Sequence, residues 1–213
     1  MIHLLCGAFE HYADVRSFLR TIMLIAYLLC FICKHTNHLF SQVQLRVGNA
    51  NKRRIQIHLM KRVAIIYESL YGNTRQIAEE IRDGLRESGN IEVRLANPGG
   101  IHTDKLCDYD IILFGSPNHN QAPTLNIMKY IDRVSIVGLE NKFGAVFDTY
   151  TGGNEGIATK KLEKTIKEKI PGITLVIDGV SFKVSGRKGP LIEGETERAR
   201  QMGRTLREKI PEE

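Results

Sequence analysis

The sequence is poor in several features that would point to particular classes of protein. It contains no tryptophan, and only one of its four cysteines, Cys107, lies beyond residue 33. Cysteine usage therefore says little about the redox compartment, and because Cys107 has no CxxC partner we interpret it as a packing residue. The longest apolar run, residues 22–33, is short of the roughly 17–25 residues that cross a bilayer, so we expect no membrane span.

A net charge of +6 on 213 residues is unevenly distributed along the chain. Residues 1–59 hold 7 Lys and Arg against 2 Asp and Glu, whereas residues 60–213 hold 23 against 22. With 42% hydrophobic and 25% charged residues, the composition is that of a globular chain long enough for one domain and an appendage. The excess of basic residues belongs to the appendage and gives no reason to expect nucleic-acid binding.

Residues 1–59 are predicted to be an N-terminal extension, irregular or short-helical and peripheral to function. Cys30, Cys33, His35 and His38 are residue types that bind zinc, but their spacing is cramped, so we favour a short apolar helix with incidental cysteines. Met60 opens a new pattern, M-K-R-V-A-I-I-Y. An over-extended start and a genuine extension both fit, and the predicted domain is 60–213.

Strand and helix patterns alternate from Met60 onward. Apolar or alternating segments predict strands at 63–67, 91–95, 110–115, 144–148 and 173–177. Apolar residues at helical spacing predict helices at 74–87, 122–134, 155–169 and 195–210. Such alternation indicates a parallel sheet covered on both faces, with ligands beyond the carboxyl ends of the strands. Function is therefore sought after Tyr67, Gly115 and Asp148.

The loop after the first strand, E-S-L-Y-G-N-T at 68–74, leads directly into a helix. Helix N-termini favour anions, Ser69 and Thr74 carry hydroxyl donors, and Gly72 permits close backbone approach, so a terminal phosphate is the expected guest. Alternatively, Asn73 or Thr74 merely caps the helix, with Gln76 completing a capping box. The loop has neither G-x-x-x-x-G-K-[ST] nor G-x-G-x-x-G, which argues against the nucleotide sites those patterns define.

Three loop sequences together resemble those of a known family. S-L-Y-G-N-T resembles the FMN phosphate loop of flavodoxins, and G-S-P-N-H-N at 115–120 and F-D-T-Y-T-G-G-N-E-G at 147–156 resemble their two flavin-ring loops. The likeness covers about residues 60–210 and is closest to flavodoxin modules of archaeal and anaerobe diflavin-type flavoproteins and their stand-alone relatives. It implies a three-layer α/β fold, with a doubly wound, five-stranded parallel sheet in the order 2-1-3-4-5.

The resemblance also implies a role for each matching residue. The FMN phosphate would be held by Ser69, Tyr71, Gly72, Asn73 and Thr74. One side of the flavin ring would be flanked by Ser116, Pro117, Asn118, His119 and Asn120. The other edge would be met by Thr149, Tyr150, Thr151, Gly152 and Gly153. We expect neither a catalytic residue nor a metal site.

Two positions in these loops invite alternative interpretations. Many flavodoxins stack a tryptophan on the ring, and related modules carry it at the position of Gly152; here Tyr150 is the remaining aromatic candidate and Tyr71 a weaker one. His119 would lie beside the ring, where an imidazole can tune the flavin or shuttle a proton. We favour the simpler interpretation of His119 as a solvated loop residue.

The leading hypothesis is an FMN-binding, cytoplasmic electron carrier, a monomer or weak oligomer that serves redox proteins docking at the flavin edge. One alternative is an NAD(P)H-dependent flavin or quinone oxidoreductase on the same fold, although no insertion that would build a substrate pocket is evident. A flavin-free interaction module is the second alternative. The basic turn at 186–190, G-R-K-G-P, is interpreted as solvated, with contact to a phosphate or an acidic partner as the other option.

Overall fold

The computed structural model describes residues 60–87 and 89–211. Its sheet contains β1 (Lys61–Tyr67), β2 (Ile91–Ala96), β3 (Ile111–Pro117), β4 (Lys142–Tyr150), β5 (Ile173–Leu175) and β6 (Val180–Lys183). The strands run in the order β2-β1-β3-β4-β5, β6 also pairs with β4, and every pairing is parallel. The predicted order of 2-1-3-4-5 is confirmed.

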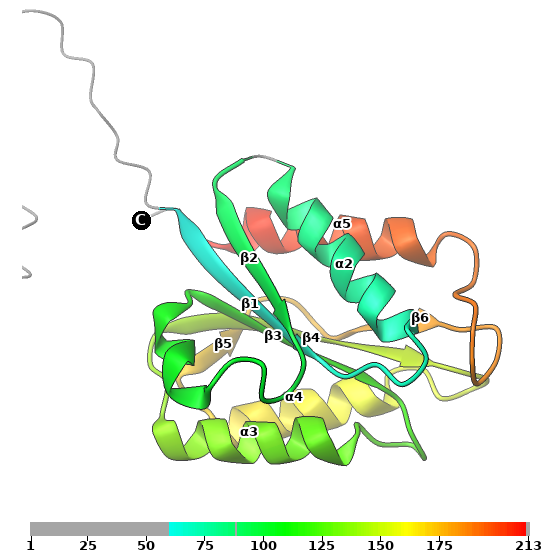
Figure 1. The fold of residues 1–213 in the computed structure, drawn as a ribbon, viewed down its shortest axis with the longest axis horizontal. Helices are drawn as coiled ribbons and strands as arrows, with labels where there is room; N and C mark the ends of the chain where they lie inside the picture. Colours follow the sequence, from blue (N-terminus) through cyan, green and yellow to red (C-terminus); the bar gives the residue numbers. More distant parts are fainter. Residues whose placement is uncertain (1–59, 88, 212–213) are drawn as a thin grey trace, which may run out of the picture. The chain divides into compact units, whose positions relative to one another are not determined.

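Four α-helices and one 3-10 helix accompany the strands. They are α2 (Asn73–Arg86), η1 (Thr103–Asp108), α3 (Leu125–Val137), α4 (Ile157–Lys169) and α5 (Glu195–Lys209). Figure 1 shows α2 and α5 on one face of the sheet and α3 and α4 on the other. The predicted three-layer, doubly wound α/β architecture is confirmed, with helix ends shifted by up to three residues.

Alternation along the central strands builds two apolar cores, one on each face of the sheet. On β1, Val63 and Ile65 pack toward α2 and α5, whereas Ala64 and Ile66 pack toward α3 and α4. All four are completely buried, and β3 is equally apolar. These strands read as continuous apolar runs because both of their faces are covered by helices.

The fifth strand departs from the prediction of one continuous segment at 173–177. β5 pairs with β4 only along Lys142–Gly144, and β6 resumes the same edge along Phe147–Tyr150. The intervening segment contains Asp178 and Gly179, which are both depleted in strands. The second half of this broken strand brings the following residues to the carboxyl end of β4.

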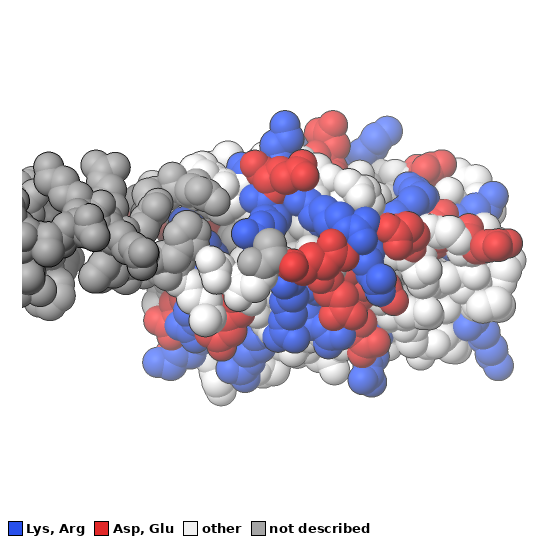
Figure 2. All heavy atoms as spheres, turned by 90° about the horizontal axis from the view of Figure 1, so that it is seen from above, with Lys and Arg blue, Asp and Glu red and all other residues white. Residues whose placement is uncertain are grey.

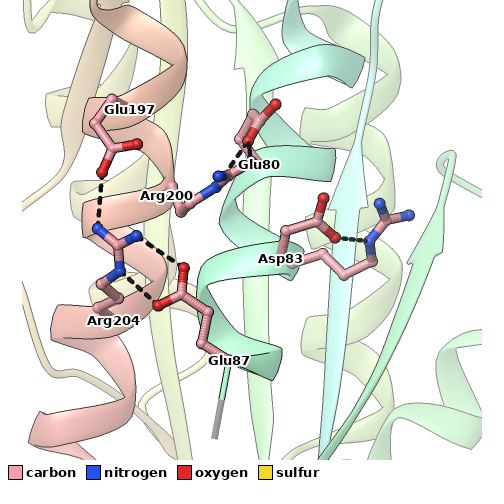
Figure 3. A network of polar contacts seen from close by, with 7 residues as sticks. Glu80, Asp83, Glu87, Glu197, Arg200 and Arg204 are labelled. Atoms are coloured by element: carbon pink, nitrogen blue, oxygen red, sulfur yellow. Dashed lines mark hydrogen bonds and ion pairs between the residues drawn. The ribbon is translucent and has the colours of Figure 1, made fainter.

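Charges of both signs are interleaved on the face that α2 and α5 cover (Figure 2). Arginines of α5 join carboxylates of α2 there: Arg200 pairs with Glu80 at 2.6 Å, and Arg204 pairs with Glu87 at 2.7 Å (Figure 3). No helix among residues 60–87 and 89–211 is long and apolar enough to cross a membrane. Contrary to its predicted packing role, Cys107 is exposed.

The predictions for residues 1–59, including the zinc-type ligands Cys30, Cys33, His35 and His38, lie outside the described part of the chain. Within the described part, no group of three or more His, Cys, Asp and Glu side chains could hold a metal ion.

Candidate functional site

A cleft of about 90 Å³ opens where β1, β3 and β4 end. Nine of the fifteen predicted site residues line it: Tyr71, Asn73, Thr74, Pro117, Asn118, His119, Thr149, Tyr150 and Thr151. Pockets that enclose a small molecule usually measure roughly 300–1,000 Å³. A ligand as large as a flavin would therefore lie across this cleft with much of its edge open.

The first wall of the cleft is the loop that starts α2. Gly72 is the N-cap, in the left-handed conformation at φ 91°. The space beside it is open, since a Cβ added there would have no atom within 4 Å. The Ser69 hydroxyl oxygen accepts hydrogen bonds from the N–H groups of Gly72 (3.1 Å) and Arg75 (3.2 Å). The predicted cap by Asn73 or Thr74 is therefore wrong, because serine fills that role from within the loop.

This arrangement leaves donors for an anion. Neither the Asn73 nor the Thr74 backbone N–H has a hydrogen-bond acceptor among the described residues. Both belong to the first turn of a helix, where the macrodipole favours negative charge. The Ser69 hydroxyl proton is also free to be donated, since both of its hydrogen bonds here are accepted.

The second wall is a tight hairpin after β3. The His119 N–H donates to the Ala122 carbonyl (2.8 Å), and the Ala122 N–H donates to the His119 carbonyl (3.1 Å). Between them Asn120 and Gln121 have φ of 50° and 60°, as the two central residues of a type I′ turn require. The side chain of His119 is exposed and lines the cleft.

Hydrogen bonds join the three loops into one framework. The Thr74 and Thr149 hydroxyls share a buried hydrogen bond of 2.8 Å, which ties the start of α2 to the end of β4. Asn118 donates from its backbone to the Thr149 carbonyl (2.8 Å) and from its side chain to the Asn154 carbonyl (2.9 Å). These bonds link the three walls of the cleft to one another.

Six predicted site residues do not line the cleft: Ser69, Gly72, Ser116, Asn120, Gly152 and Gly153. Ser116 is fully buried, and its hydroxyl oxygen accepts a hydrogen bond from the Thr124 N–H (2.9 Å) at the start of α3. This hydrogen bond joins the end of β3 to the start of α3 beneath the 117–122 loop. Gly152 and Gly153 are exposed in the turn that follows β4.

The two aromatic candidates differ in exposure. Tyr150 is 7% exposed, whereas Tyr71 is 45% exposed, and both lie on the cleft wall. Burial comes first among the causes that raise the pKa of Tyr150, followed by the nearby Glu155 carboxylate. Tyr71 therefore offers the more open ring face, the reverse of the order suggested by the sequence.

Asp148 lies directly beneath the third loop. It is fully buried on β4, and its Oδ2 accepts a hydrogen bond from the Thr159 N–H (3.1 Å) near the start of α4, while its Oδ1 has no partner. Burial raises its pKa to about 6, although the nearby Ser181 side chain and the backbone N–H groups at the start of α4 act to lower it. This carboxyl caps α4 from inside the core, because the N-cap residue, Gly156, has no side chain to do so.

Four cleft residues were missed by the sequence-based assignment: Leu70, Val184, Gly186 and Arg187. The last three follow β6 and lie far in sequence from the 68–74 loop. The basic turn was visible in the sequence, but no local pattern places it beside residues 71–74.

Comparison with known proteins agrees with this geometry. The family described as "Flavodoxin domain" matches residues 64–176. A flavodoxin of Clostridium saccharobutylicum is 31% identical over 157 residues, covering 70% of this chain and 97% of that protein. An NAD(P)H dehydrogenase (quinone) of Archaeoglobus fulgidus is 30% identical over 116 residues, covering 41% of this chain and 61% of that protein.

Among solved structures, a flavodoxin from the domain Archaea superimposes with a TM-score of 0.60 at 23% identity, covering 70% of this chain and 97% of that one. The chain therefore belongs to the flavodoxin family, as its three loops predicted. Its function is that of a flavodoxin-like electron carrier.

Proposed function

We propose that the chain carries electrons by means of an FMN held in the cleft at the ends of β1, β3 and β4. The observation that carries this proposal is that the N–H groups of Asn73 and Thr74 are unpaired among the described residues and lie next to the open space beside Gly72. When bound, FMN supplies the redox chemistry, and the protein supplies position, electrostatics and edge exposure.

The phosphate end of the cofactor fits the first wall. The N–H groups of Asn73 and Thr74 and the Ser69 hydroxyl have no acceptor among the described residues, and the space beside Gly72 is open, which supports assigning the phosphate there. A phosphate needs several donors, and a helix N-terminus offers them together with a favourable dipole. Tyr71 contributes the side of the cleft next to this point.

The ring end fits the second and third walls. Pro117 and the hairpin at 119–122 stiffen one side, and Thr149, Tyr150 and Thr151 form the other. Their backbone groups can reach the polar edge of a flavin, and the open face of Tyr71 can cover part of its apolar plane. Gly152 and Gly153 leave the outer edge uncovered, which suits electron exchange with a docking redox protein.

The partners we propose are other redox proteins that dock at this open edge. Residues 60–213 are close to electrically neutral, so docking through one broad acidic surface is not the mode we expect. We further propose that residues 1–59 are peripheral to this function.

A quinone reductase is the second candidate, because the Archaeoglobus fulgidus relative carries that name. We place it second because that relative matches only 41% of this chain, whereas the flavodoxin of Clostridium saccharobutylicum matches 70%.

The test is to purify the full chain, release any bound flavin, and rebuild the holoprotein with FMN. The proposal predicts a yellow protein that rebinds FMN and, once reduced, passes electrons to an oxidised acceptor protein such as cytochrome c. A colourless protein that cannot be reconstituted would overturn both flavin proposals. Rapid NAD(P)H oxidation with a quinone would favour the reductase over the carrier.

A further inference from the structure

A β-turn late in the sequence, at residues 186–189, lies against the loop that starts α2. The Gly189 N–H donates to the Gly186 carbonyl (3.0 Å), which makes Arg187 and Lys188 the two central residues of the turn. An antiparallel bridge joins the segments on either side of it. Two basic side chains are thereby placed at the tip of a short, hydrogen-bonded hairpin.

This turn is fastened to the first residue of α2. The Asn73 side-chain amide donates to the Lys188 carbonyl (3.3 Å) across 115 residues of sequence. Packing there is close: a Cβ added at Gly189, where φ is 105°, would lie 2.5 Å from the Asn73 Oδ1 atom. The basic turn is therefore held against the same loop whose N–H groups are open to an anion.

The two basic residues of the turn are not equivalent. Arg187 lines the cleft, whereas Lys188 does not. Among residues 60–87 and 89–211, no Asp or Glu lines the cleft, and Arg187 is the only Lys or Arg that does. Within the described residues, Arg187 forms no salt bridge with a carboxylate. An unpaired guanidinium at a cleft without carboxylates favours a ligand that brings its own negative charge.

We infer that Arg187 pairs with the phosphate group of the bound flavin nucleotide, so that the cleft recognises FMN by charge as well as by hydroxyl and backbone donors. This inference rests on the proposed function. A phosphate monoester carries about −1.5 to −2 charges at neutral pH, and the planar guanidinium matches two of its oxygens. Arg187 thereby separates FMN from riboflavin, which has the same ring and no phosphate.

The experiment compares Arg187→Gln with Lys188→Gln in the full-length protein stripped of flavin. Each variant loses one positive charge at adjacent positions of the same turn, but only the first loses a cleft residue. Titration with FMN and with riboflavin, followed by quenching of flavin fluorescence, gives both dissociation constants. We expect Arg187→Gln to weaken FMN binding by about 5- to 20-fold and riboflavin binding by less than about 2-fold. Lys188→Gln should change either by less than about 2-fold.

Salt gives a second readout. If the guanidinium meets the phosphate, raising the salt concentration should weaken FMN binding to the wild type more steeply than to Arg187→Gln. Unchanged FMN affinity in a folded Arg187→Gln variant would overturn the inference, as would an equal loss for FMN and riboflavin. If the wild type binds neither flavin, it is the proposed function itself that fails.

Discussion

The two helical layers of the domain are held together by different means. Between α2 and α5 the backbones touch: a Cβ added at Gly84 would lie 2.1 Å from the Arg200 carbonyl oxygen, and one at Gly203 would lie 2.3 Å from the Ile81 carbonyl oxygen. Ion pairs then cross the outside of this contact (Figure 3). Both glycines are required because no side chain fits between the helices.

The opposite layer relies on buried side chains. α3 and α4 cover the sheet with apolar residues, and one ion pair, between Lys169 and Asp132 (2.5 Å), links the two helices. Its buried polar groups include Tyr130, whose hydroxyl donates to the Ile101 carbonyl (2.8 Å), and Asp148 beneath α4. The helix that follows the 68–74 loop, α2, is therefore fixed by backbone contact, whereas α4 depends on a titratable carboxyl at its start.

The largest effect is expected from a substitution that breaks the backbone contact between α2 and α5. Gly203→Val places a branched side chain against the Ile81 carbonyl, so we expect it to destabilise the fold by about 3 kcal/mol. Denaturant unfolding of the full chain measures this loss. Gln201→Val introduces the same side chain on the exposed side of the same helix, away from the contact with α2, and should cost less than about 1 kcal/mol. Equal losses in the two variants would contradict the close contact.

Replacing the buried carboxyl of Asp148 should stabilise the fold rather than destabilise it. Asp148 has a folded-state pKa of about 6, above its ordinary value of 3.8. Between these two values the folded protein retains a proton that the unfolded chain releases. Stability contributed by this proton is fully present below pH 4 and is lost as the pH rises through 6. Asp148→Asn should therefore be more stable than the wild type by about 2 kcal/mol at pH 8, and nearly equal to it at pH 4.

Unfolding curves collected between pH 4 and pH 8 test this prediction. Asp104→Asn, an exposed carboxylate on η1, serves as the control and should follow the wild-type curve. If Asp148→Asn also followed that curve, the buried carboxyl would not be linked to folding.

A smaller loss is expected where α3 meets the segment before η1. Burial raises the pKa of Tyr130 to about 12, so its hydroxyl stays protonated and donates to Ile101. Tyr130→Phe leaves that buried carbonyl without its donor and should cost about 1–2 kcal/mol in denaturant unfolding. Tyr71→Phe, at an exposed ring, should leave stability within about 0.5 kcal/mol of the wild type, and an equal effect would argue against the buried bond.

The smallest expected effect comes from the outer ion pairs. Arg204 bridges Glu87 and Glu197, and these carboxylates raise its pKa further above the usual value. Arg204→Gln should lower the melting temperature by about 2 °C in low salt and by less in 1 M salt, since exposed pairs are weak and screened. A loss that is independent of salt would point to packing of the arginine stem instead.

Most of the architecture could be predicted because buried parallel strands are continuous apolar runs and their helices repeat at a fixed spacing. The 63–67 and 110–115 segments gave strands in this way, and the loops after them gave the first two walls of the cleft. The broken fifth strand was missed, since β5 and β6 are short and the apolar segment predicted at 173–177 ends before β6. The helix cap was also missed: Ser69 acts from three residues before Gly72, through a turn that only a left-handed glycine permits.

The amino-acid sequence alone determined the order of the elements, the position of the cleft and membership in the flavodoxin family, because these depend on local periodicity and on short loop motifs. Tertiary structure decided which distant residues meet there. It brings Arg187 beside the loop at the start of α2 through the contact between Asn73 and the 186–190 turn, and it buries Asp148 beneath α4. Those outcomes depend on how strands and helices pack, since neither residue differs in sequence context from an ordinary charged residue at a strand end or in a turn.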